Sequence, residues 1–560
     1  MKDMNQRVFI TLALTLAVWW GYELVFRPKP VPRTAAVATA PASATAPSAP
    51  GGAATTPAAQ ADVPRGTPPA APRPPVQKVT FDTERLHLVL TSDGASVEAA
   101  LLKGDKFTRH NQGSKEQSQV NLVASRAGEP LPFSTVVKSA AGAVLVPADA
   151  AYEVLRHDDH SATFRAQVDG VTVLKTLTVD PKTYRLDLGV EVRAATAVAG
   201  HLDVLIGGHG EAPSGGLFGS RSNVPARTIC ASGGKVERVA VGAKTPTWDG
   251  PGTVEFAGVD EQYFLAAIVP PAQPASTCHL EALEKGSLVS TVSIPLSVAA
   301  GSATTLQFTG YLGPKDTEEL ASVAKPLRRA VDFGFWSIIA DVLLGVMRFF
   351  YKVIPGHNWG IAIILLTVSM KVVTFPLQHK SMKSMQEMQR IQPQLEEMKK
   401  KFAGDTQRQN LEQMKLFKEH GVNPMGSCLP MVIQMPIWFA LYTTLQVSVE
   451  LYNSVFIPGW LTDLTAKDPY YVLPVAMGIT MILTQVLTPT PMSNPSQKTM
   501  GYAMSGFFSL LMMSLPSGLT LYIFVNNLLS IAQQMYLRRT MKPPEPPASA
   551  RTLAISPKRV

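Results

Sequence analysis

A lysine inside an apolar segment is the feature of this sequence with the clearest chemical consequence. Residues 361–382 read IAIILLTVSMKVVTFPLQHKSM, and Lys371 lies well within the apolar run. A lysine near the centre of a lipid bilayer costs roughly 2.5–3.5 kcal/mol on insertion scales. Thr367, Thr374 and Gln378 lie at helical spacings from the lysine, so the four polar side chains share one face of a helix. The pattern predicts a polar face that needs water or polar partners inside a membrane segment.

Other apolar segments of the chain also carry polar residues at helical spacing. These are Gln434 in one segment, Thr480, Thr484 and Thr488 in a second, and Tyr522, Asn526, Ser530 and Gln533 in a third. Such residues usually face the interior of a helix bundle or a water-filled cavity. The alternative, hydrogen bonds between helices that only hold a bundle together, stays open for the threonines.

The charge of Lys371 favours a water-filled cavity over hydrogen bonds that only hold the bundle together. No acidic residue occurs in the other apolar segments of the C-terminal half, so water or lipid phosphate must compensate the ammonium group. A hydrated cavity open to the cytoplasm would do so. We expect Lys371 in such a cavity to attract an acidic residue of a polypeptide and to lower the cost of drawing a polar segment partway into the membrane.

The composition fits a membrane protein that also has a large domain outside the membrane. The chain has 560 residues, of which 46% are hydrophobic and 17% charged. Five apolar segments in its C-terminal part have about the length needed to span hydrocarbon. They cover residues 358–378, 424–447, 470–490, 499–515 and 517–537. The motif PSG at 516–518 predicts a tight turn between the last two segments.

A sixth apolar segment, residues 8–26, follows a short N-terminus of residues 1–7. It is longer than the usual apolar region of a signal peptide and has no small-x-small cleavage site beside it. We therefore expect an uncleaved transmembrane anchor rather than a signal peptide. Residues 27–78 are rich in Pro and Ala and cannot bury enough apolar surface to fold, which predicts an extended linker.

Residues 79–325 predict an all-β domain. Alternating apolar and polar runs flank Asp93-Gly94 and Asp169-Gly170, which is the strongest short sequence signal for a hairpin. Further alternating runs occur at 183–194, 233–242, 253–259 and 288–298. Many strands joined by short polar turns predict an antiparallel β-sandwich.

The segment that follows, residues 326–354, is ambiguous. It contains four charged residues, Asp332, Asp341, Arg348 and Lys352, which argue against a transmembrane helix. Its apolar residues recur near helical spacing and form one face. We therefore expect an amphipathic helix that lies in the membrane interface.

The basic residues predict the orientation of the chain. Residues 379–423 contain nine Lys and Arg residues, and the tail at 538–560 contains six. Both regions should be cytoplasmic under the positive-inside rule. With 326–354 on the membrane surface, the rule gives six transmembrane helices, both termini in the cytoplasm and the β domain on the outer side.

The cytoplasmic segment 379–423 predicts a helical hairpin that is broken near residues 403–405 and ends at Gly421. Met382, Met385 and Met388 share one face and could bind varied apolar segments, since methionine adapts to irregular partners. The alternative is that these methionines pack within the hairpin or against lipid. The basic residues of the hairpin could bind anionic lipid or RNA, or could act only as a topology signal.

The sequence offers no catalytic or metal-binding motif. The histidines of the β domain are scattered, and we find no metal-ligand spacing, nucleophile elbow or phosphate loop in it. We expect neither a metal nor a cofactor, and not an enzyme. Cys230 and Cys278 could form a disulfide in an oxidising compartment, although the sequence alone does not show that they are close enough.

Three stretches of the C-terminal half carry a family resemblance. They are GVNPMGSCLPMVIQMPIWFALY at 421–442, DPYYVLPVAMGITM at 468–481 and PSGLTLYIFVNNLLSIAQQ at 516–534. They resemble the YidC/Oxa/Alb family of membrane protein insertases. The β domain behind an N-terminal anchor is similar to the Gram-negative bacterial form of that family, and the resemblance covers essentially the whole chain.

The resemblance implies a multi-domain membrane protein of six transmembrane helices with a five-helix core and a periplasmic β-supersandwich. It implies a hydrophilic groove that is open to the cytoplasm and lipid, and a chaperone-like insertion of nascent proteins into the inner membrane. It further implies that insertion proceeds alone or with the Sec translocon and its accessory complex, without ATP hydrolysis by the insertase. A ribosome at the basic hairpin and tail and anionic phospholipids are the other expected partners, whereas DNA is not.

The resemblance also assigns residues to the groove. The family's groove cation falls on Lys371, where many bacterial members have arginine, and Thr367 matches a groove hydroxyl position. Many members have two adjacent tyrosines around Tyr522, but the second position here is Ile523. The complete expected substrate-binding groove consists of Lys371, Thr367, Thr374, Gln378, Gln434, Tyr522 and Asn526.

Two other functions deserve comparison. A small-solute or proton-coupled transporter would have paired intramembrane acids or internal repeats with broken helices, and the sequence has neither. An intramembrane protease could use Ser369 and Lys371 as nucleophile and base. Residues two apart on a helix point in different directions, which weakens this reading.

Overall fold

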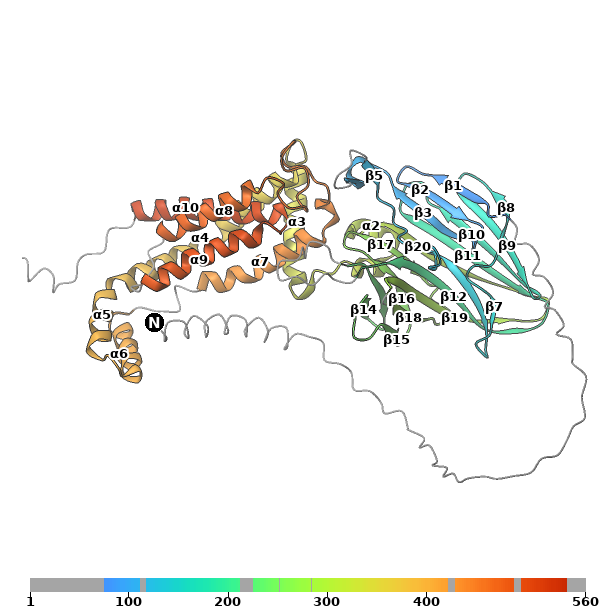
Figure 1. Cartoon of the computed structure of the whole chain (residues 1–560), viewed down its shortest axis with the longest axis horizontal. Helices are drawn as coiled ribbons and strands as arrows, with labels where there is room; N and C mark the ends of the chain where they lie inside the picture. The colour runs from blue at the N-terminus through green and yellow to red at the C-terminus, as the bar shows by residue number, and fades with distance from the viewer. Residues whose placement is uncertain are drawn as a thin grey trace, which may run out of the picture. The chain divides into compact units, whose positions relative to one another are not determined.

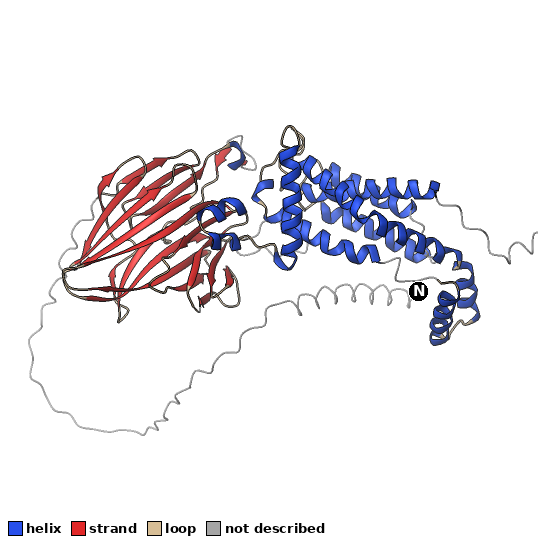
Figure 2. Cartoon of the chain, turned by 180° about the vertical axis from the view of Figure 1, so that it is seen from behind, coloured by secondary structure: helices blue, strands red, loops and turns tan. Residues whose placement is uncertain are grey.

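Strands and helices occupy separate parts of the chain in the computed structural model (Figure 2). The structure describes residues 75–110, 117–211, 225–250, 252–283, 285–421, 429–487 and 495–540. The predicted N-terminal anchor at 8–26, nearly all of the linker at 27–78 and most of the basic tail at 538–560 lie outside these residues.

The β domain is built on a nine-stranded sheet in which every pairing is antiparallel. The strands in spatial order are β14 (Lys235–Ala240), β13 (Arg227–Ser232), β16 (Val254–Asp260), β17 (Phe264–Val269), β20 (Ala303–Pro314), β11 (Arg185–Ala194), β10 (Val171–Val179), β9 (Ser161–Val168) and β8 (Glu153–His157). Its neighbouring strands are partly distant in sequence, so the sheet is not a simple meander. Figure 1 labels these strands.

Three smaller sheets complete the β domain. A six-stranded antiparallel sheet has the order β15 (Thr247–Gly250), β18 (Thr277–Ala282), β19 (Ser287–Val298), β12 (Val198–His209), β6 (Ser134–Ser139) and β7 (Val144–Val146). A three-stranded sheet contains β1 (Lys78–Asp82), β2 (Leu86–Thr91) and β3 (Ser96–Leu102), and a two-stranded ribbon contains β4 (Thr108–His110) and β5 (Gln117–Gln119). The predicted antiparallel all-β domain is therefore confirmed.

Both predicted Asp-Gly hairpins are present. Asp169 and Gly170 join β9 to β10 with φ angles of 43° and 79°, which suits a tight two-residue turn between twisted strands. Gly94 lies between β2 and β3 with φ of 70°. A Cβ atom added at Gly94 would lie 2.3 Å from the carbonyl oxygen of Ala148, so no other residue fits there without movement.

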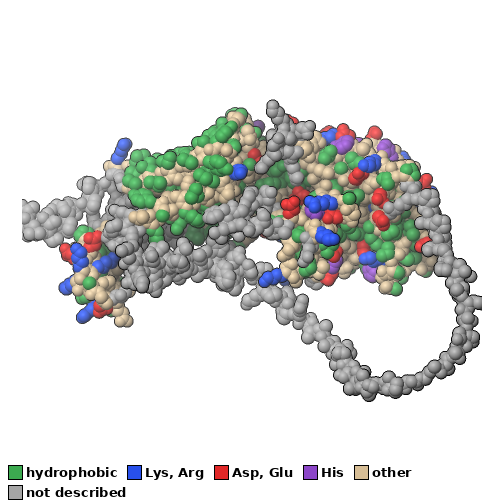
Figure 3. Space-filling model, viewed as in Figure 1, with side chains coloured by type: hydrophobic (Ala, Val, Ile, Leu, Met, Phe, Trp, Pro, Cys, Tyr) green, Lys and Arg blue, Asp and Glu red, His purple; other side chains and the backbone are tan. Residues whose placement is uncertain are grey.

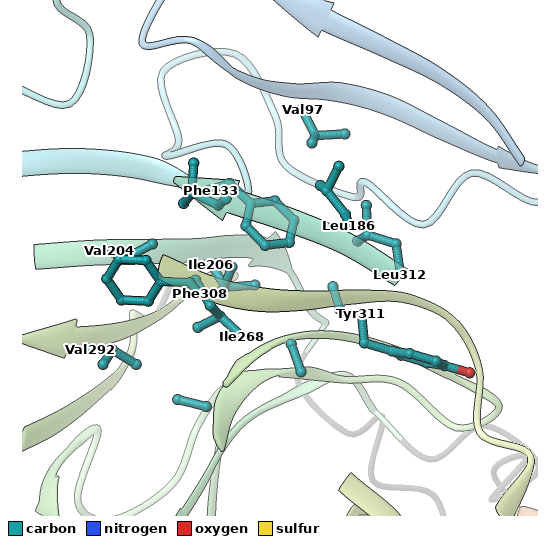
Figure 4. Close-up of a cluster of buried hydrophobic side chains, with 14 of the residues drawn as sticks. Val97, Phe133, Leu186, Val204, Ile206, Ile268, Val292, Phe308, Tyr311 and Leu312 are labelled. Carbon is teal, nitrogen blue, oxygen red and sulfur yellow. The ribbon is translucent and has the colours of Figure 1, made fainter. Parts of the chain in front are cut away.

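Alternation along the strands produces the core between the sheets. In β10 the odd-numbered residues from Val171 to Val179 are buried, as the period of two requires. Phe133, Phe308 and Ile268 come from different strands or loops and lie in the same buried cluster, which Figure 4 shows. The core is thus a single apolar layer that the sheets share.

The two cysteines of the β domain lie on different sheets. Cys230 belongs to β13 and Cys278 to β18, both are buried, and their Cα atoms are 6.7 Å apart. The structure joins their sulfur atoms across the interface of the two sheets. We propose that this disulfide forms in the native protein. Labelling free thiols on the unfolded, unreduced chain should then modify Cys428 alone, whereas labelling of all three cysteines would contradict it.

A lysine is fully buried in the core of the β domain. Lys175 occupies an inward-facing position of β10, and its Nζ donates hydrogen bonds to the carbonyl oxygens of Gly94 at 2.9 Å and Phe133 at 2.7 Å. The same nitrogen lies 5.6 Å from the centre of the Tyr152 ring. Burial lowers the pKa of the Lys175 ammonium to about 7. A neutral amine still has two N–H donors for the two carbonyl groups.

The buried lysine makes the stability of the β domain depend on pH. An unfolded lysine has a pKa near 10.4, so between about pH 7 and 10 the unfolded chain binds more protons than the folded chain. The free energy of unfolding should therefore rise with pH in this window, by at most about 1.4 kcal/mol per pH unit. Urea unfolding of the full-length protein, followed by its antiparallel-sheet infrared band, would measure this at pH 7 and 9.

Two lysine variants separate this effect from the other titrating groups. Lys175→Met should remove the rise in stability between pH 7 and 9, whatever it does to the absolute stability. Lys182→Met, which replaces an exposed lysine beside the same sheet, should preserve the rise. An equal pH dependence in all three proteins would show that Lys175 is not the responsible group.

A buried carboxylate binds three cations at one end of the β domain. Lys315 Nζ donates to Oδ1 of Asp260 at 2.7 Å, and Arg238 Nε donates to Oδ2 at 3.0 Å. Arg227 Nη2 approaches Oδ2 at 3.3 Å. Burial alone would raise the pKa of Asp260, but these three cations outweigh it and hold the pKa below its ordinary value. Arg238 also donates to the carbonyl oxygen of Ala330 at 3.0 Å, which ties the sheet to the segment that leaves it.

Helices follow the β domain. They are α2 (Thr317–Val323), α3 (Ser337–Val353), α4 (Trp359–Arg390), α5 (Gln392–Lys401), α6 (Thr406–Glu419), α7 (Leu429–Val447), α8 (Val472–Leu487), α9 (Pro495–Met512) and α10 (Ser517–Thr540), with short 3₁₀ turns η2 (Lys325–Ala330), η3 (Gly334–Trp336) and η5 (Val449–Leu451). A helix lies at each of the five predicted C-terminal spans.

Three predicted boundaries differ from the structure. α4 continues without a break to Arg390, beyond the predicted end of the span at 378, because Pro376 alone does not interrupt it. The predicted hairpin consequently has an additional break at Ile391, while the break near 403–405 is present between α5 and α6. Helix α10 begins at Ser517, the predicted start of the last segment at 517–537, but the turn before it falls at 513–516 rather than at 516–518.

Helix α3 has one buried and one exposed apolar face. Ala340, Leu343, Leu344 and Met347 are buried, whereas Ile338, Val342, Phe349 and Val353 are exposed. Arg348 Nε donates to Glu450 Oε1 at 3.1 Å, so this charge is paired inside the helical region. In Figure 1, α3 runs across the direction of α4, α7 and α8.

Two helical stretches among the described residues have the length needed to cross a membrane. Gly334–Val353 and Trp359–Ser381 are long and apolar enough to cross a membrane, and Val472–Leu487 is a shorter apolar helix. Length and composition therefore do not distinguish an interfacial role for α3 from a spanning one.

The hairpin of α5 and α6, which the sequence predicts to be cytoplasmic, has a small core of its own. Ile391 and Leu395 are buried, and Met388, Met398, Leu416 and Phe417 pack against them. Met388 thus packs within the hairpin, which is the alternative to an open binding surface. Met382 and Met385 belong to α4, but their side chains lie outside the described part of the structure.

Candidate functional site

Hydrophobic packing is concentrated in one half of the helix bundle. The buried apolar residues there are Trp359, Ala362, Ile363 and Leu366 of α4, Ala440, Leu441 and Leu445 of α7, Leu473 and Met477 of α8, Met512 of α9, and Leu519, Leu521 and Tyr522 of α10. They occupy the beginning of α4, α8 and α10 and the end of α7 and α9. This half of the bundle is packed like the core of a soluble protein.

The opposite half of the bundle is packed differently. Beyond Leu366 in α4, Met477 in α8 and Tyr522 in α10, Ile531 is the one buried apolar side chain among the described residues of these three helices. Polar residues are partly or fully buried there instead, including Lys371 and Gln534. We call the polar residues Thr367, Lys371, Thr374, Gln378, Gln434, Tyr522, Asn526 and Ser530 the polar track.

Lys371 joins two helices through a hydroxyl group. Its Nζ donates to Ser530 Oγ at 2.8 Å, and Ser530 Oγ in turn donates to the backbone oxygen of Asn526 at 2.7 Å. The ammonium group on α4 is therefore bonded to α10. The sequence contains no Asp or Glu in α7 to α10, so a carboxylate partner from those helices is excluded. Ser530 is a direct hydrogen-bond partner of Lys371, but its hydroxyl is neutral, so the prediction that water or lipid phosphate compensates the charge stays a prediction.

A second hydrogen bond joins α7 to α10. Gln434 Nε2 donates to the hydroxyl oxygen of Tyr522 at 2.8 Å. Tyr522 is buried at the edge of the apolar packing, while Gln434 is half-buried. Both cross-helix bonds of the polar track thus end on α10, at positions eight residues apart, which are about 80° apart around the helix.

The other predicted residues mostly bond within their own helix. Thr367 Oγ1 donates to the oxygen of Ile363 at 2.7 Å, and Thr374 Oγ1 donates to the oxygen of Met370 at 2.8 Å. Gln378 Nε2 approaches the hydroxyl of Thr374 at 3.3 Å. Such bonds satisfy a hydroxyl inside an apolar environment without a partner helix. Thr367 is fully buried, whereas Thr374 and Gln378 are half-buried.

The threonines of α8 follow the same rule. Thr480 Oγ1 donates to the oxygen of Met477 at 2.8 Å, and Thr484 Oγ1 donates to the oxygen of Thr480 at 2.8 Å. Thr488 lies outside the described residues. Both of these bonds are intrahelical.

The surface around the bundle is strongly apolar. Exposed apolar side chains include Val372, Val373 and Phe375 of α4, Ile479, Ile482, Leu483 and Val486 of α8, and Met504, Phe507 and Leu510 of α9. Figure 3 shows hydrophobic side chains gathered over the helices and charged ones on the hairpin of α5 and α6. An apolar surface of this extent suits contact with lipid rather than with water.

Sequence reasoning placed Ser530 on the polar face of its segment but did not include it among the groove residues. The signal was present, because Ser530 follows Tyr522 and Asn526 at helical spacing. What the sequence could not show was that α4 and α10 pack at this height. The described residues contain no group of His, Cys, Asp and Glu that could hold a metal ion.

The fold and the polar track define a class of protein: a membrane-embedded helix bundle with a polar half, attached to a large β-sandwich. The family models agree with this division. Residues 349–545 match the model described as the 60Kd inner membrane protein, and residues 78–346 match the YidC periplasmic domain. The chain belongs to the YidC family.

Individual relatives cover nearly the whole chain. A protein of Anaeromyxobacter sp. (strain Fw109-5) named membrane protein insertase YidC is 42% identical over 488 residues, which is 85% of this chain and 87% of the relative. A protein of Geobacter metallireducens with the same name is 32% identical over 559 residues, which is 96% of this chain and 99% of the relative. A crystal structure described as an active YidC insertase aligns with 82% of this chain and 92% of its own, at 19% identity and a TM-score of 0.36.

Proposed function

We propose that this protein is a membrane protein insertase of the inner membrane, which receives nascent membrane proteins at the polar track and releases them into lipid. The observation that supports the proposal most is the placement of Lys371. It is a cation in the half of the bundle where few of the described apolar side chains are buried, and it donates a hydrogen bond to a neutral hydroxyl. The relatives of this chain carry the name membrane protein insertase.

The mechanism follows from the cost of moving polar groups into lipid. A charged or hydrogen-bonding group of a translocating segment is expensive in hydrocarbon without a partner. The polar track offers such partners at successive depths, with Gln378 and Thr374 nearer the cytoplasmic hairpin and Tyr522 next to the apolar packing. An acidic group could bind Lys371 while the apolar part of the same segment contacts lipid. No covalent step is required, so the protein does not act as an enzyme.

The topology that serves this function has six transmembrane helices. They are the N-terminal anchor at 8–26 and the helices α4, α7, α8, α9 and α10, with the β domain in the periplasm and both termini in the cytoplasm. We assign α3 to the membrane interface, because its direction crosses that of the bundle and its paired Arg348 lies near its C-terminal end.

The basic hairpin and tail suggest further partners. Lys399, Lys400 and Lys401 are exposed at the end of α5, close to where a ribosome or anionic phospholipids would lie in this topology. Cooperation with the Sec translocon and its accessory complex is part of the same proposal, on the ground of family membership.

An intramembrane protease is disfavoured by a specific contact. Ser369 Oγ donates to the oxygen of Leu365 at 2.8 Å, while Lys371 Nζ donates to Ser530. A nucleophile and its base must bond to each other, and these two side chains bond elsewhere. A transporter would need paired intramembrane acids, and α7 to α10 contain none.

Reconstitution tests the proposal against both alternatives. The purified full-length protein in liposomes is incubated with a labelled single-span substrate, and external protease is then added. Protected full-length substrate supports insertion, and the same yield in protein-free liposomes would contradict it. Cleaved substrate before protease addition would instead indicate proteolysis.

A further inference from the structure

Ser530 accepts a hydrogen bond from the ammonium group of Lys371. Lysine ammonium has three N–H donors, and one of them is directed to Ser530 Oγ at 2.8 Å. Ser530 uses its own proton for the backbone oxygen of Asn526, so its oxygen is left to accept from the lysine. The Ser530 hydroxyl thus accepts a hydrogen bond from the ammonium group as a carboxylate oxygen would, but it has no negative charge.

We propose that Ser530 is a positioning residue that closes the polar track between substrates by holding the Lys371 ammonium against α10. This inference rests on the proposed function. An arriving acidic residue displaces the Ser530 hydroxyl, because a carboxylate adds the attraction between two opposite charges to the hydrogen bond, whereas the hydroxyl offers the ammonium group a hydrogen bond alone. A segment with a neutral amide in the same place gains less binding free energy from Lys371, so the hydrogen bond between Lys371 and Ser530 remains. Ser530 therefore sets how strongly the site prefers acidic segments.

The geometry of α10 supports this role. Ser530 and Tyr522 are about 80° apart around α10, and each bonds to a different neighbouring helix, α4 and α7. Helix α10 thereby bonds to both α4 and α7. The side-chain nitrogens of Asn527 and Gln533, on the same stretch of α10, are buried without a hydrogen-bond partner among the described residues. These two amide nitrogens can therefore donate hydrogen bonds to an incoming chain beside Ser530.

The inference makes a prediction about affinity. Ser530→Ala removes the competing acceptor, so an acidic segment no longer has to break a hydrogen bond to reach Lys371. Water replaces part of the lost bond to the ammonium group in this variant, so the net gain is that of a typical hydrogen bond, which changes an affinity by about two- to tenfold. The variant should therefore bind an acidic segment about two- to tenfold more tightly. It should bind a neutral one within about twofold of the unaltered protein. Ser530→Thr keeps the hydroxyl and should behave as the unaltered protein does.

The experiment uses the full-length protein in phosphatidylcholine nanodiscs at neutral pH. Two fluorescent single-span peptides are compared, identical except for one Asp or one Asn at the middle of the apolar segment. The dissociation constants of both peptides are measured for the unaltered protein, Ser530→Ala, Ser530→Thr and Lys371→Met. The ratio of the two constants is the readout, because a general loosening of the bundle would change both peptides alike.

The outcomes separate this inference from the proposed function. A higher Asp preference in Ser530→Ala, with Ser530→Thr unchanged and no preference in Lys371→Met, supports the positioning role. An unaltered or reduced preference in Ser530→Ala overturns it, even if Lys371→Met loses the preference. If the preference survives in Lys371→Met, or no peptide binds to any of the four proteins, the proposed charged site itself fails and the inference fails with it.

Discussion

Replacing Lys371 with methionine should reduce insertion of substrates that carry an acidic residue in their membrane segment by about ten- to hundredfold. A hydrogen bond to a charged group contributes about 1.5–3 kcal/mol, and each 1.4 kcal/mol corresponds to a factor of ten. Methionine keeps much of the volume of the lysine side chain but cannot bind a carboxylate. Substrates without an acidic residue should be inserted almost normally, because the apolar surface of the bundle is unchanged.

Two further variants control this result. Lys371→Arg keeps the charge and should retain most of the activity, although the planar fork of arginine bonds differently from an ammonium group. Val373→Ala alters an exposed side chain two residues away on the same helix and should have no effect. Insertion yield in proteoliposomes, measured for an acidic and a neutral substrate, is the readout. Full activity of Lys371→Met with every substrate would exclude a binding role for the charge.

Replacing Asp260 with asparagine should destabilise the β domain by about 3–5 kcal/mol, since removing one partner of a buried ion pair leaves the other charge uncompensated. Asp260 and Lys315 are both almost fully buried, and Arg238 is 12% exposed. Three cations would then surround a neutral amide. The effect should be present at neutral pH and shrink in acid, because a carboxylate with a lowered pKa loses its contribution as the pH falls through that value.

A matched variant in the same sheet shows whether burial is responsible. Asp187 pairs with Arg185, but their side chains are 38% and 43% exposed, so Asp187→Asn should cost no more than about 1 kcal/mol. Adding Lys315→Met to Asp260→Asn should recover part of the stability. Chemical unfolding of the full-length variants, followed by the sheet signal, measures both effects. Equal losses for the two single variants would contradict the account of the buried cluster.

Local patterns in the sequence predicted much of the β domain. The Asp169-Gly170 turn and the alternating runs on either side of it depend only on neighbouring residues, and the structure places β9 and β10 there. Lys175 could have been predicted as buried by the same alternation, because it occupies an inward position between Val173 and Leu177. The sequence pattern therefore indicates a buried lysine at this position, although it does not indicate the two carbonyl groups that the lysine binds.

Contacts between distant residues were beyond the reach of sequence patterns. The four members of the buried charge cluster, Arg227, Arg238, Asp260 and Lys315, come from separate strands and their ends, and no spacing connects them. The bond from Lys371 to Ser530 joins residues 159 positions apart, so it depends on how α4 packs against α10. Helical periodicity predicts which residues form the polar face of each helix, but it does not predict which residues of other helices that face contacts.

Site-specific photocrosslinking tests the central claim most directly. A photoreactive residue is placed at the half-buried positions Thr374, Gln378 and Asn526 of the polar track, and at the exposed apolar positions Val373 and Ile479 as controls. Ribosomes that carry a stalled nascent membrane protein are then added to membranes containing each variant. We expect crosslinks to the nascent chain from the three track positions and few from the two controls. Equal crosslinking from both sets, or none from the track, would contradict the assignment of the polar track as the site that receives polypeptide.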